Sequence, residues 1–259
     1  MAGQAAPATY TILGREVRMP VEVRDATASV AYYMVPAGVA QALIAASGLR
    51  VATMLPGRTL CTIGTMEYKD NDLGRYHEVA ITFFVREPGA RALPLVGGVL
   101  GMARGGLAAY IHQLPVDAEF SMEAGRGIWG FPKFMSWIDI SRERGVETAT
   151  LRVDRKLVLT QEVRLGGRRR FGPRDQVSYA LRNGVLYRTP STMSGDGVGF
   201  RMGGARIELG DHPIADELRS LGLPKRPLFS TTIARMSARF GAPEVLGLAT
   251  AGAASGTPT

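Results

Sequence analysis

Runs of residues that suit β-strands dominate the sequence and restrict the chain to a small set of folds. These runs mix β-branched, aromatic and alternating apolar residues, and turn residues separate them. The clearest runs cover residues 29–35, 75–85, 148–153, 157–164 and 197–209. Many short strands with turns between them are typical of sandwiches and barrels. We therefore predict a mainly β protein.

Two short turns indicate that neighbouring strands pair antiparallel. Asn183 and Gly184 separate the runs 177–181 and 185–188, and both residue types accept the positive φ of a type I′ turn. A second turn is expected near residues 154–155. Because a two-residue turn joins antiparallel strands, we expect an antiparallel sheet.

Two segments have helical periodicity, and both are short. They cover residues 37–46 and 213–221, and Asp211 is the expected N-cap of the second. No strand–helix–strand alternation and no internal repeat is visible, which disfavours a doubly wound nucleotide-binding sheet. The predicted fold class is β-rich α+β, with an antiparallel, closed or nearly closed barrel-like sheet and a few short peripheral helices.

Cysteine content and hydropathy favour a cytoplasmic protein. Cys61 is the only cysteine, which excludes an intramolecular disulfide and sites built from two cysteines, and a position in the core is expected for it. Residues 1–14 lack a basic start followed by an apolar run, so no signal peptide is expected. The most apolar stretch, residues 93–103, is broken by glycines and falls far short of the roughly 20 residues that a membrane span needs.

The net charge favours small anionic ligands over nucleic acid. The formal charge is +8, but the one dense basic run, residues 168–170, has no aromatic residues between its arginines. We therefore expect no nucleic-acid partner and no membrane partner. A positive field of this kind attracts anionic substrates such as keto acids.

The sequence predicts neither a cofactor nor a metal ion. Residues 97–106 contain several glycines but lack the spacing and the ending of a phosphate-binding loop. The apolar stretch that overlaps them, 93–103, is interpreted as a packed loop, an oligomer contact or a lid, in that order. His77, His112 and His212 are scattered without the spacing of a zinc site, so we interpret them as structural.

The most informative segment for chemistry surrounds Lys133. Residues 125–134 read Gly-Arg-Gly-Ile-Trp-Gly-Phe-Pro-Lys-Phe, so the aromatic residues Trp129, Phe131 and Phe134 enclose the lysine. Burial disfavours the ammonium and lowers the pKa of a lysine, which suits a nucleophile that attacks a ketone near neutral pH. In the alternative reading, the stem of Lys133 packs on the aromatic rings while its ammonium reaches water.

The same segment resembles the Gly-Arg-Glu-Ile…Gly-Phe-Pro-Lys signature of the acetoacetate decarboxylase family, whose lysine forms an imine with its substrate. Other segments resemble the family too: residues 72–78, Asp117 with Glu119, residues 206–212 and residues 39–44. The resemblance extends over about residues 22–235. It implies that Lys133 forms the imine and that the protein is a homo-oligomer. It also implies one domain of this family over residues 1–248, and the small, polar tail 249–259 is expected to be disordered.

The resemblance assigns roles to two further residues. The family's site glutamate corresponds to Glu78, which would orient the substrate or exchange protons at carbon; without the resemblance, Glu78 reads equally well as an exposed strand carboxylate. The family's site arginine corresponds to Arg24, although Arg15, followed by Glu16, imitates the local Arg-Glu pair better. Arg24 is favoured for its distance to the early helix, and it would hold a substrate carboxylate by paired hydrogen bonds. By default it would be a surface residue.

Two departures from the family pattern affect the expected substrate. Phe134 stands where the family's decarboxylases have a second lysine, so repulsion between two ammonium groups is absent and desolvation alone has to lower the pKa of Lys133. Ile63 stands where the family has a further site carboxylate. We therefore expect a more apolar site, with Trp129, Phe134 and Ile63 beside Arg24 as substrate-binding residues, and a larger substrate or a different reaction.

The imine that the resemblance implies serves several reactions. It accepts electrons, so either carbon dioxide leaves from a β-carboxylate or a proton leaves from the α-carbon. The leading prediction is a lyase that decarboxylates a β-keto acid, with Lys133 and Glu78 as catalytic residues and no cofactor. The alternatives are an imine-dependent aldolase or dehydratase of the same fold, and a non-catalytic protein that binds a small carbonyl compound and uses Lys133 only structurally.

Overall fold

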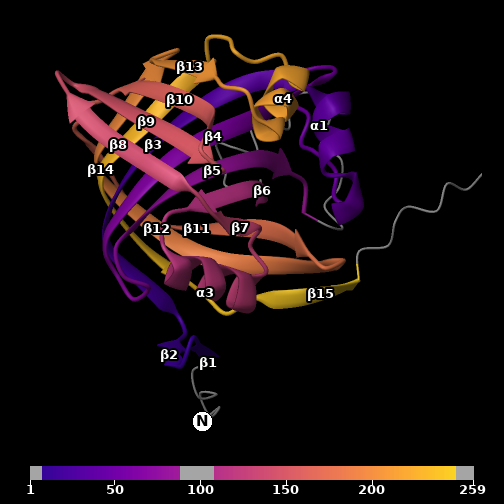
Figure 1. Ribbon diagram of the computed structural model, residues 1–259, viewed down its shortest axis with the longest axis vertical. Coiled ribbons are helices and arrows are strands. Elements are labelled where there is room, and N and C mark those ends of the chain that lie inside the picture. The colour runs from indigo at the N-terminus through magenta and orange to yellow at the C-terminus, as the bar shows by residue number, and fades with distance from the viewer. Residues whose placement is uncertain (1–7, 88–107, 249–259) are drawn as a thin grey trace, which may run out of the picture.

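The computed structural model describes residues 8–87 and 108–248, which form three β-sheets and several short helices (Figure 1). The two-stranded sheet consists of β1 (Thr9–Ile12) and β2 (Arg15–Arg18). The four-stranded sheet has the order β13 (Ala205–Leu209), β10 (Lys156–Arg164), β9 (Val146–Val153), β8 (Trp137–Glu143). The predictions for residues 93–106 and 249–259 fall outside the described residues.

The largest sheet has nine strands. Eight of them follow the order β11 (Arg169–Arg182), β12 (Val185–Met202), β14 (Phe229–Phe240), β3 (Val21–Pro36), β4 (Arg58–Asn71), β5 (Tyr76–Val85), β6 (Ala108–Val116), β7 (Lys133–Met135). The ninth strand, β15 (Glu244–Leu248), pairs with β12. The helices are α1 (Ala37–Leu43), the 3-10 turn η1 (Ala45–Ser47), α3 (Glu119–Trp129) and α4 (Pro213–Ser220). The prediction of a mainly β protein with a few short helices is confirmed.

The nine-stranded sheet is ring-like. Strand β6 pairs with β5 along one edge and also with β11, the strand at the other end of the sheet, where Ser178 lies opposite Ala109 and Tyr179 opposite Tyr110. This short pairing joins β11, the first strand of the order, to β6, the last strand but one. Within the ring, the early strand β3 pairs with the late strand β14, so residues far apart in the sequence lie next to each other.

The expectation of a wholly antiparallel sheet is wrong. Strand β7 runs parallel to β6, with Lys133 opposite Leu114 and Met135 opposite Val116, and the β6–β11 pair is parallel as well. A parallel pair needs a crossover between its strands. Helix α3 provides that crossover between β6 and β7, so Lys133 enters the sheet directly after the helix.

The predicted turns are confirmed, whereas one predicted run is divided. Asn183 and Gly184 join β11 to β12 with φ values of 51° and 75°, and residues 154–155 join β9 to β10 with φ values of 49° and 65°. The run 197–209 forms two strands of different sheets, because residues 203–204 are glycines with positive φ that redirect the chain from β12 to β13.

Both predicted helices are present, and a third, α3, was not predicted. Helix α1 is followed by the 3-10 turn η1, which together cover the first predicted segment. The N-cap of α4 is His212 and not Asp211, because Nδ1 of His212 accepts a hydrogen bond from the backbone N–H of Ile214 at 3.2 Å.

The two faces of the nine-stranded sheet pack against different partners. One face, the core face, carries Ile63, Val79 and Ile81 and packs against the four-stranded sheet, α1 and α4. The opposite face, the site face, carries Tyr68 and Tyr76 and packs against α3. Figure 1 shows β8, β9 and β10 lying across β3 and β4, and α3 lying beside β11 and β12.

Candidate active site

The side chain of Lys133 lies across helix α3 at Gly125. Gly130 ends the helix in the left-handed conformation (φ 63°), and the chain then turns through Phe131 and Pro132 into β7. A Cβ atom at Gly125 would lie only 2.5 Å from Cδ of Lys133. The absence of a side chain at Gly125 therefore makes room for the lysine stem, and the Lys133 side chain is 4% exposed.

Three buried groups surround the amine of Lys133. Nζ lies 2.9 Å from Oε2 of Glu78 on β5 and donates to Oγ of Ser121 on α3 at 2.9 Å. It also lies 4.8 Å from the centre of the Tyr76 ring. Ser121 and Gly125 are four residues apart on α3, so they share one face of the helix. Ser121 was missed by the sequence analysis because α3 itself was missed.

The carboxylate of Glu78 is held at both oxygens. Oε2 pairs with Lys133, and Oε1 accepts a hydrogen bond from the hydroxyl of Tyr68 at 3.3 Å. The rings of Tyr68 and Tyr76 stack with their centres 4.4 Å apart. Burial raises the pKa of Tyr68 well above its usual value, and the charge of Glu78 raises it further, so this phenol remains a donor to Glu78.

The predicted lowering of the Lys133 pKa is wrong. Burial is the largest single effect and lowers the pKa of this amine, but the charge of Glu78, together with contacts to Glu78 and Tyr76, outweighs it and leaves the pKa of Lys133 raised. The reason is the carboxylate 2.9 Å away, which stabilises the ammonium. The neighbouring carboxylate therefore favours the ammonium form of Lys133.

Arg126 fixes the backbone of the lysine. Its Nε donates to the carbonyl oxygen of Lys133 at 2.6 Å, and its Nη1 lies 3.7 Å from Oε1 of Glu123 one helical turn earlier. This arginine belongs to the Gly-Arg part of the motif around Lys133. The contact explains why an arginine in the helix and a lysine in the following strand occur at this spacing.

Asp117 connects the strand that carries Glu78 to the helix that carries Ser121. Its carboxylate accepts the backbone N–H of His77 at 2.7 Å and contacts Nδ1 of the His77 ring at 2.6 Å. The hydrogen bond that the His77 ring makes to the Asp117 carboxylate raises the pKa of His77. Asp117 lies just before α3, so this contact fixes the start of the helix against the start of β5.

Trp129 and Phe134 are close to Lys133 in the sequence, but they pack in different clusters of the structure. Nε1 of Trp129 donates to the carbonyl oxygen of Gly241 at 2.9 Å, and its ring lies 5.6 Å from that of Phe131. Trp129 belongs to the same buried cluster as Tyr76. Phe134 is half-buried and packs against the cluster on the core face.

Ile63 and Arg24 are not brought into contact with the amine. Ile63 is fully buried on the core face of β4, the face opposite Tyr68. Arg24 is 46% exposed and pairs with Asp70 at 2.7 Å and Asp72 at 2.6 Å. The guanidinium of the alternative candidate, Arg15, stacks 4.0 Å above the ring of Phe120 on α3.

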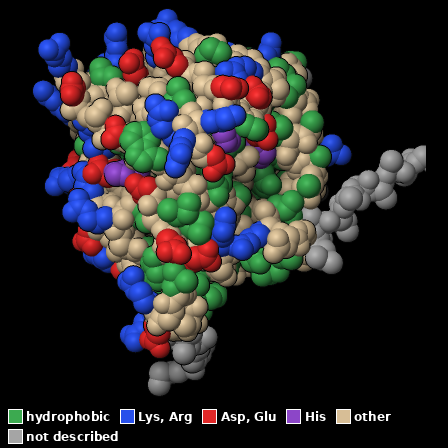
Figure 2. Space-filling view, viewed as in Figure 1, with side chains coloured by type: hydrophobic (Ala, Val, Ile, Leu, Met, Phe, Trp, Pro, Cys, Tyr) green, Lys and Arg blue, Asp and Glu red, His purple; other side chains and the backbone are tan. Residues whose placement is uncertain are grey.

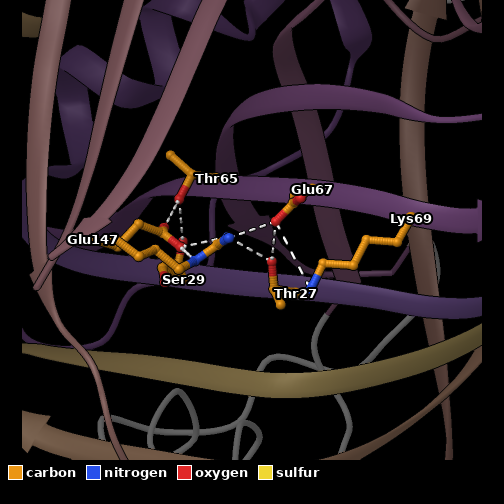
Figure 3. A network of polar contacts seen from close by, with 7 residues as sticks. Thr27, Ser29, Thr65, Glu67, Lys69 and Glu147 are labelled. Carbon is orange, nitrogen blue, oxygen red and sulfur yellow. Dashed lines mark hydrogen bonds and ion pairs between the residues drawn. The ribbon is translucent and has the colours of Figure 1, made fainter. Parts of the chain in front are cut away.

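A polar network on the core face holds the two larger sheets together. Arg142 of β8 donates to Oγ1 of Thr27 at 2.7 Å and to Oε2 of Glu147 at 2.9 Å, and it also pairs with Glu67. Glu147 accepts a further hydrogen bond from Thr65 at 2.7 Å. Figure 3 shows Thr27, Thr65, Glu67 and Glu147 converging from β3, β4 and β9. Because the network lies on the core face, we assign it to the fold and not to the site.

Residues 8–87 and 108–248 contain neither a cluster of metal ligands nor a helix that could span a membrane. No group of three or more potential metal ligands occurs among those residues. The helices in the same ranges include none that is long and apolar enough to cross a membrane. On the face shown in Figure 2, acidic side chains are interspersed among the more numerous basic ones.

The ring-like sheet, the crossover helix and the buried lysine paired with a carboxylate define a class of mainly β proteins with a lysine-based site. A family model for acetoacetate decarboxylase (ADC) matches residues 5–246, and the chain belongs to this family. A comparison with curated proteins finds no significant match.

Solved structures share the fold of this chain at low sequence identity. An acetoacetate decarboxylase matches with a TM-score of 0.67 and 16% identity over 90% of this chain and 92% of its own. The acetoacetate decarboxylase of Legionella pneumophila matches with a TM-score of 0.63 and 14% identity over 88% of both chains. The enduracididine biosynthesis enzyme MppR, in complex with the condensation product of pyruvate and imidazole 4-carboxaldehyde, matches with a TM-score of 0.61 and 16% identity over 95% of this chain and 98% of its own.

Proposed function

We propose that this protein is a Schiff-base-forming lyase in which Lys133 condenses with a β-keto acid and decarboxylates it. The observation that carries the proposal is the buried contact of 2.9 Å between Nζ of Lys133 and the carboxylate of Glu78. Both side chains are almost fully buried, so the amine and its proton acceptor are enclosed together. Membership of the acetoacetate decarboxylase family supports the same chemistry.

Glu78 makes Lys133 nucleophilic by accepting its proton. The raised pKa of Lys133 means that the amine is charged before substrate arrives, and a charged amine does not attack a carbonyl. Transfer of one proton from Nζ to Glu78 neutralises both groups and moves no net charge out of the buried site. Phe134 replaces the second lysine, so this internal transfer takes the place of repulsion between two ammonium groups.

The decarboxylation then proceeds through an iminium and an enamine on Lys133. The neutral amine attacks the ketone carbon, Glu78 returns its proton, and one water leaves as the iminium forms. The bond to the carboxylate breaks, carbon dioxide leaves, and the electron pair of that bond neutralises the iminium to give an enamine. Glu78 takes one proton from water, which leaves as hydroxide to the solvent, and delivers that proton to the enamine carbon. Hydrolysis by one water releases the ketone and restores the Lys133 ammonium beside the Glu78 carboxylate.

Trapping of the imine tests the proposal. Acetoacetate is incubated with the protein in the presence of borohydride, which reduces the imine to a stable adduct, and the modified peptide is identified by mass. We expect the adduct on Lys133 in the wild type and none at this position in Lys133→Ala. If a panel of keto acids, ketones and aldehydes leaves Lys133 unmodified, the protein is a binding protein and the proposal is wrong.

A second candidate function is aldol addition followed by dehydration through the same imine. It is favoured by the similarity of the fold to MppR, which was solved with a condensation product of pyruvate and an aldehyde. Analysis of products separates the two reactions. Carbon dioxide released from a β-keto acid supports the lyase, whereas loss of pyruvate and aldehyde together, without carbon dioxide, supports the alternative.

A further inference from the structure

Rows of uncharged side chains lead away from Glu78 along the site face. Residues directly opposite each other on paired strands point to the same side of a sheet, so the strand registers define these rows. The first row, across β5, β4, β3 and β14, is Glu78, Met66, Ala28 and Ile233. The second row, which reaches β12, is Ala80, Gly64, Val30, Thr231 and Phe200. The third row is Thr82, Thr62, Tyr32, Phe229 and Met202.

The middle of these rows is partly accessible, although the strands that carry them are central in the sheet. Val30, Ala80 and Thr82 are half-buried, as are several of their neighbours. On the core face of the same strands, Ile63 and Val79 are 0% exposed. The accessible area of these strands therefore faces the side on which Glu78 lies. We call this surface the apolar strip.

The chemical character of the apolar strip changes with distance from the reacting amine. Glu78 is the one charged side chain in the three rows. The second row contains small side chains, and Gly64 contributes none. In the third row, the hydroxyls of Thr62 and Thr82 form a hydrogen bond of 2.6 Å with each other. The rings of Tyr32 and Phe229 stack with their centres 4.2 Å apart. The third row lies four residues along β5 from Glu78, which corresponds to about 13 Å in a strand.

We infer that the substrate carries a neutral, mainly apolar group on the far side of its keto carbon and that this group lies on the apolar strip. The inference rests on the proposed function, because the strip begins at the pair that would hold the reacting carbonyl. A second carboxylate would lose its hydration there without meeting a cation in the three rows, which disfavours dicarboxylic keto acids. The substrate class is a β-keto acid with an alkyl or aryl group that reaches from the small second row toward the aromatic third row.

A series of substrates tests this inference directly. Decarboxylation is measured as kcat/KM for acetoacetate, for 3-oxohexanoate, 3-oxooctanoate and 3-oxo-3-phenylpropanoate, and for the dicarboxylate 3-oxoglutarate. Each methylene group that the strip covers is expected to raise kcat/KM roughly fourfold, from the transfer free energy of one buried methylene. The phenyl compound is also expected to have a higher kcat/KM than acetoacetate, and 3-oxoglutarate is expected to have the lowest kcat/KM of the series.

Variants at Gly64 show whether the strip itself is responsible. A Cβ at Gly64 would lie 3.5 Å from both Met66 and Val30, an ordinary contact, so alanine fits and serves as the matched control. Gly64→Leu fills the second row and is expected to lower kcat/KM for the longer substrates at least tenfold more than it lowers kcat/KM for acetoacetate, so that the advantage of a longer chain is lost. Thermal unfolding of both variants verifies that they fold.

The outcomes separate this inference from the proposed function. If acetoacetate forms the Lys133 adduct but chain length has no effect, or if 3-oxoglutarate is preferred, the inference is overturned and the lyase remains. If Gly64→Leu lowers kcat/KM equally for short and long substrates, the apolar group lies elsewhere and the inference is also overturned. If no member of the series forms an adduct on Lys133, the proposed function fails and the inference with it.

Discussion

A methyl group at position 125 would occupy space that the Lys133 side chain uses. The Cβ of an alanine at Gly125 would lie 2.5 Å from Cδ, 2.8 Å from Cε and 3.2 Å from Cγ of Lys133. At such distances, either the lysine turns away from α3 or the helix moves outward. In both cases Nζ leaves its position 2.9 Å from both Glu78 and Ser121. Gly125→Ala therefore tests whether the path of the lysine over the helix sets up the reaction.

Stability and reactivity are expected to change by different amounts in Gly125→Ala. Overpacking costs about 1–3 kcal/mol, and alanine is about 1 kcal/mol better than glycine inside a helix. The free energy of unfolding is therefore expected to fall by at most about 2 kcal/mol. Misplacement of a reacting group by about 1 Å costs on the order of 100-fold in rate. We expect imine formation to slow by about this factor in a protein that remains folded.

The assay compares Gly125→Ala with Gly127→Ala in the same helix. A Cβ at Gly127 would meet only the flexible end of Ile12, at 3.1 Å, so this variant changes helix propensity without touching the lysine. The rate of adduct formation on Lys133 with acetoacetate and borohydride is measured beside urea unfolding for both proteins. Unchanged imine formation in Gly125→Ala would refute the reasoning, and equal slowing in both variants would assign the effect to the helix as a whole.

Three further predictions follow from the charged contacts. Glu78→Gln removes the counter-ion of Lys133, so the Lys133 amine is expected to titrate at lower pH and imine trapping is expected to be retained. Turnover is expected to fall by about 100-fold or more, because the variant has no proton donor at this position. Unchanged turnover would reject this role of Glu78. The folded pKa of His77 is raised, so its pairing with Asp117 stabilises the protein most below about pH 6.5 and the gain is lost as the pH rises through the raised pKa. The difference in melting temperature between wild type and Asp117→Asn is therefore expected to shrink above that pH, and a constant difference contradicts the pairing. Glu147→Gln breaks the network of Figure 3 and is expected to lower the free energy of unfolding by about 1–3 kcal/mol in urea, against at most about 0.5 kcal/mol for the exposed control Glu208→Gln; equal losses would reject the network.

The strands and hairpins were predictable because their signals are local. Alternation within each run and the Asn183–Gly184 turn depend only on neighbouring residues, and both are present in the structure. Helix α3 was missed because Gly125 and Gly127 lie in its interior, where each glycine costs roughly 1 kcal/mol relative to alanine. Packing of Ile128 and Trp129 in the core holds this segment helical despite that cost.

The candidate site was predictable in part, because its members are distant in sequence. Local composition showed that Lys133 is enclosed by apolar residues, and the family resemblance pointed to Glu78. Neither showed that the two side chains meet at 2.9 Å, which reverses the predicted direction of the lysine pKa. Ser121 reaches the amine only because the chain turns back after Gly130, a consequence of tertiary structure that composition does not reveal.

The last prediction concerns Phe134, the residue at the position of the family's second lysine. Adjacent residues of a strand point to opposite sides, and Phe134 packs against the core-face cluster while Lys133 contacts Glu78. An ammonium in Phe134→Lys would therefore be buried among apolar side chains or turn out to water, away from Nζ of Lys133. We expect a lower free energy of unfolding and little change in the pKa of Lys133, because Glu78 still determines it. The pH dependence of Lys133 modification is compared in wild type, Phe134→Lys and the size control Phe134→Leu. A clear drop in the Lys133 pKa in the lysine variant alone would show that repulsion reaches the amine across β7, and the account in which Glu78 activates Lys133 would have to be abandoned.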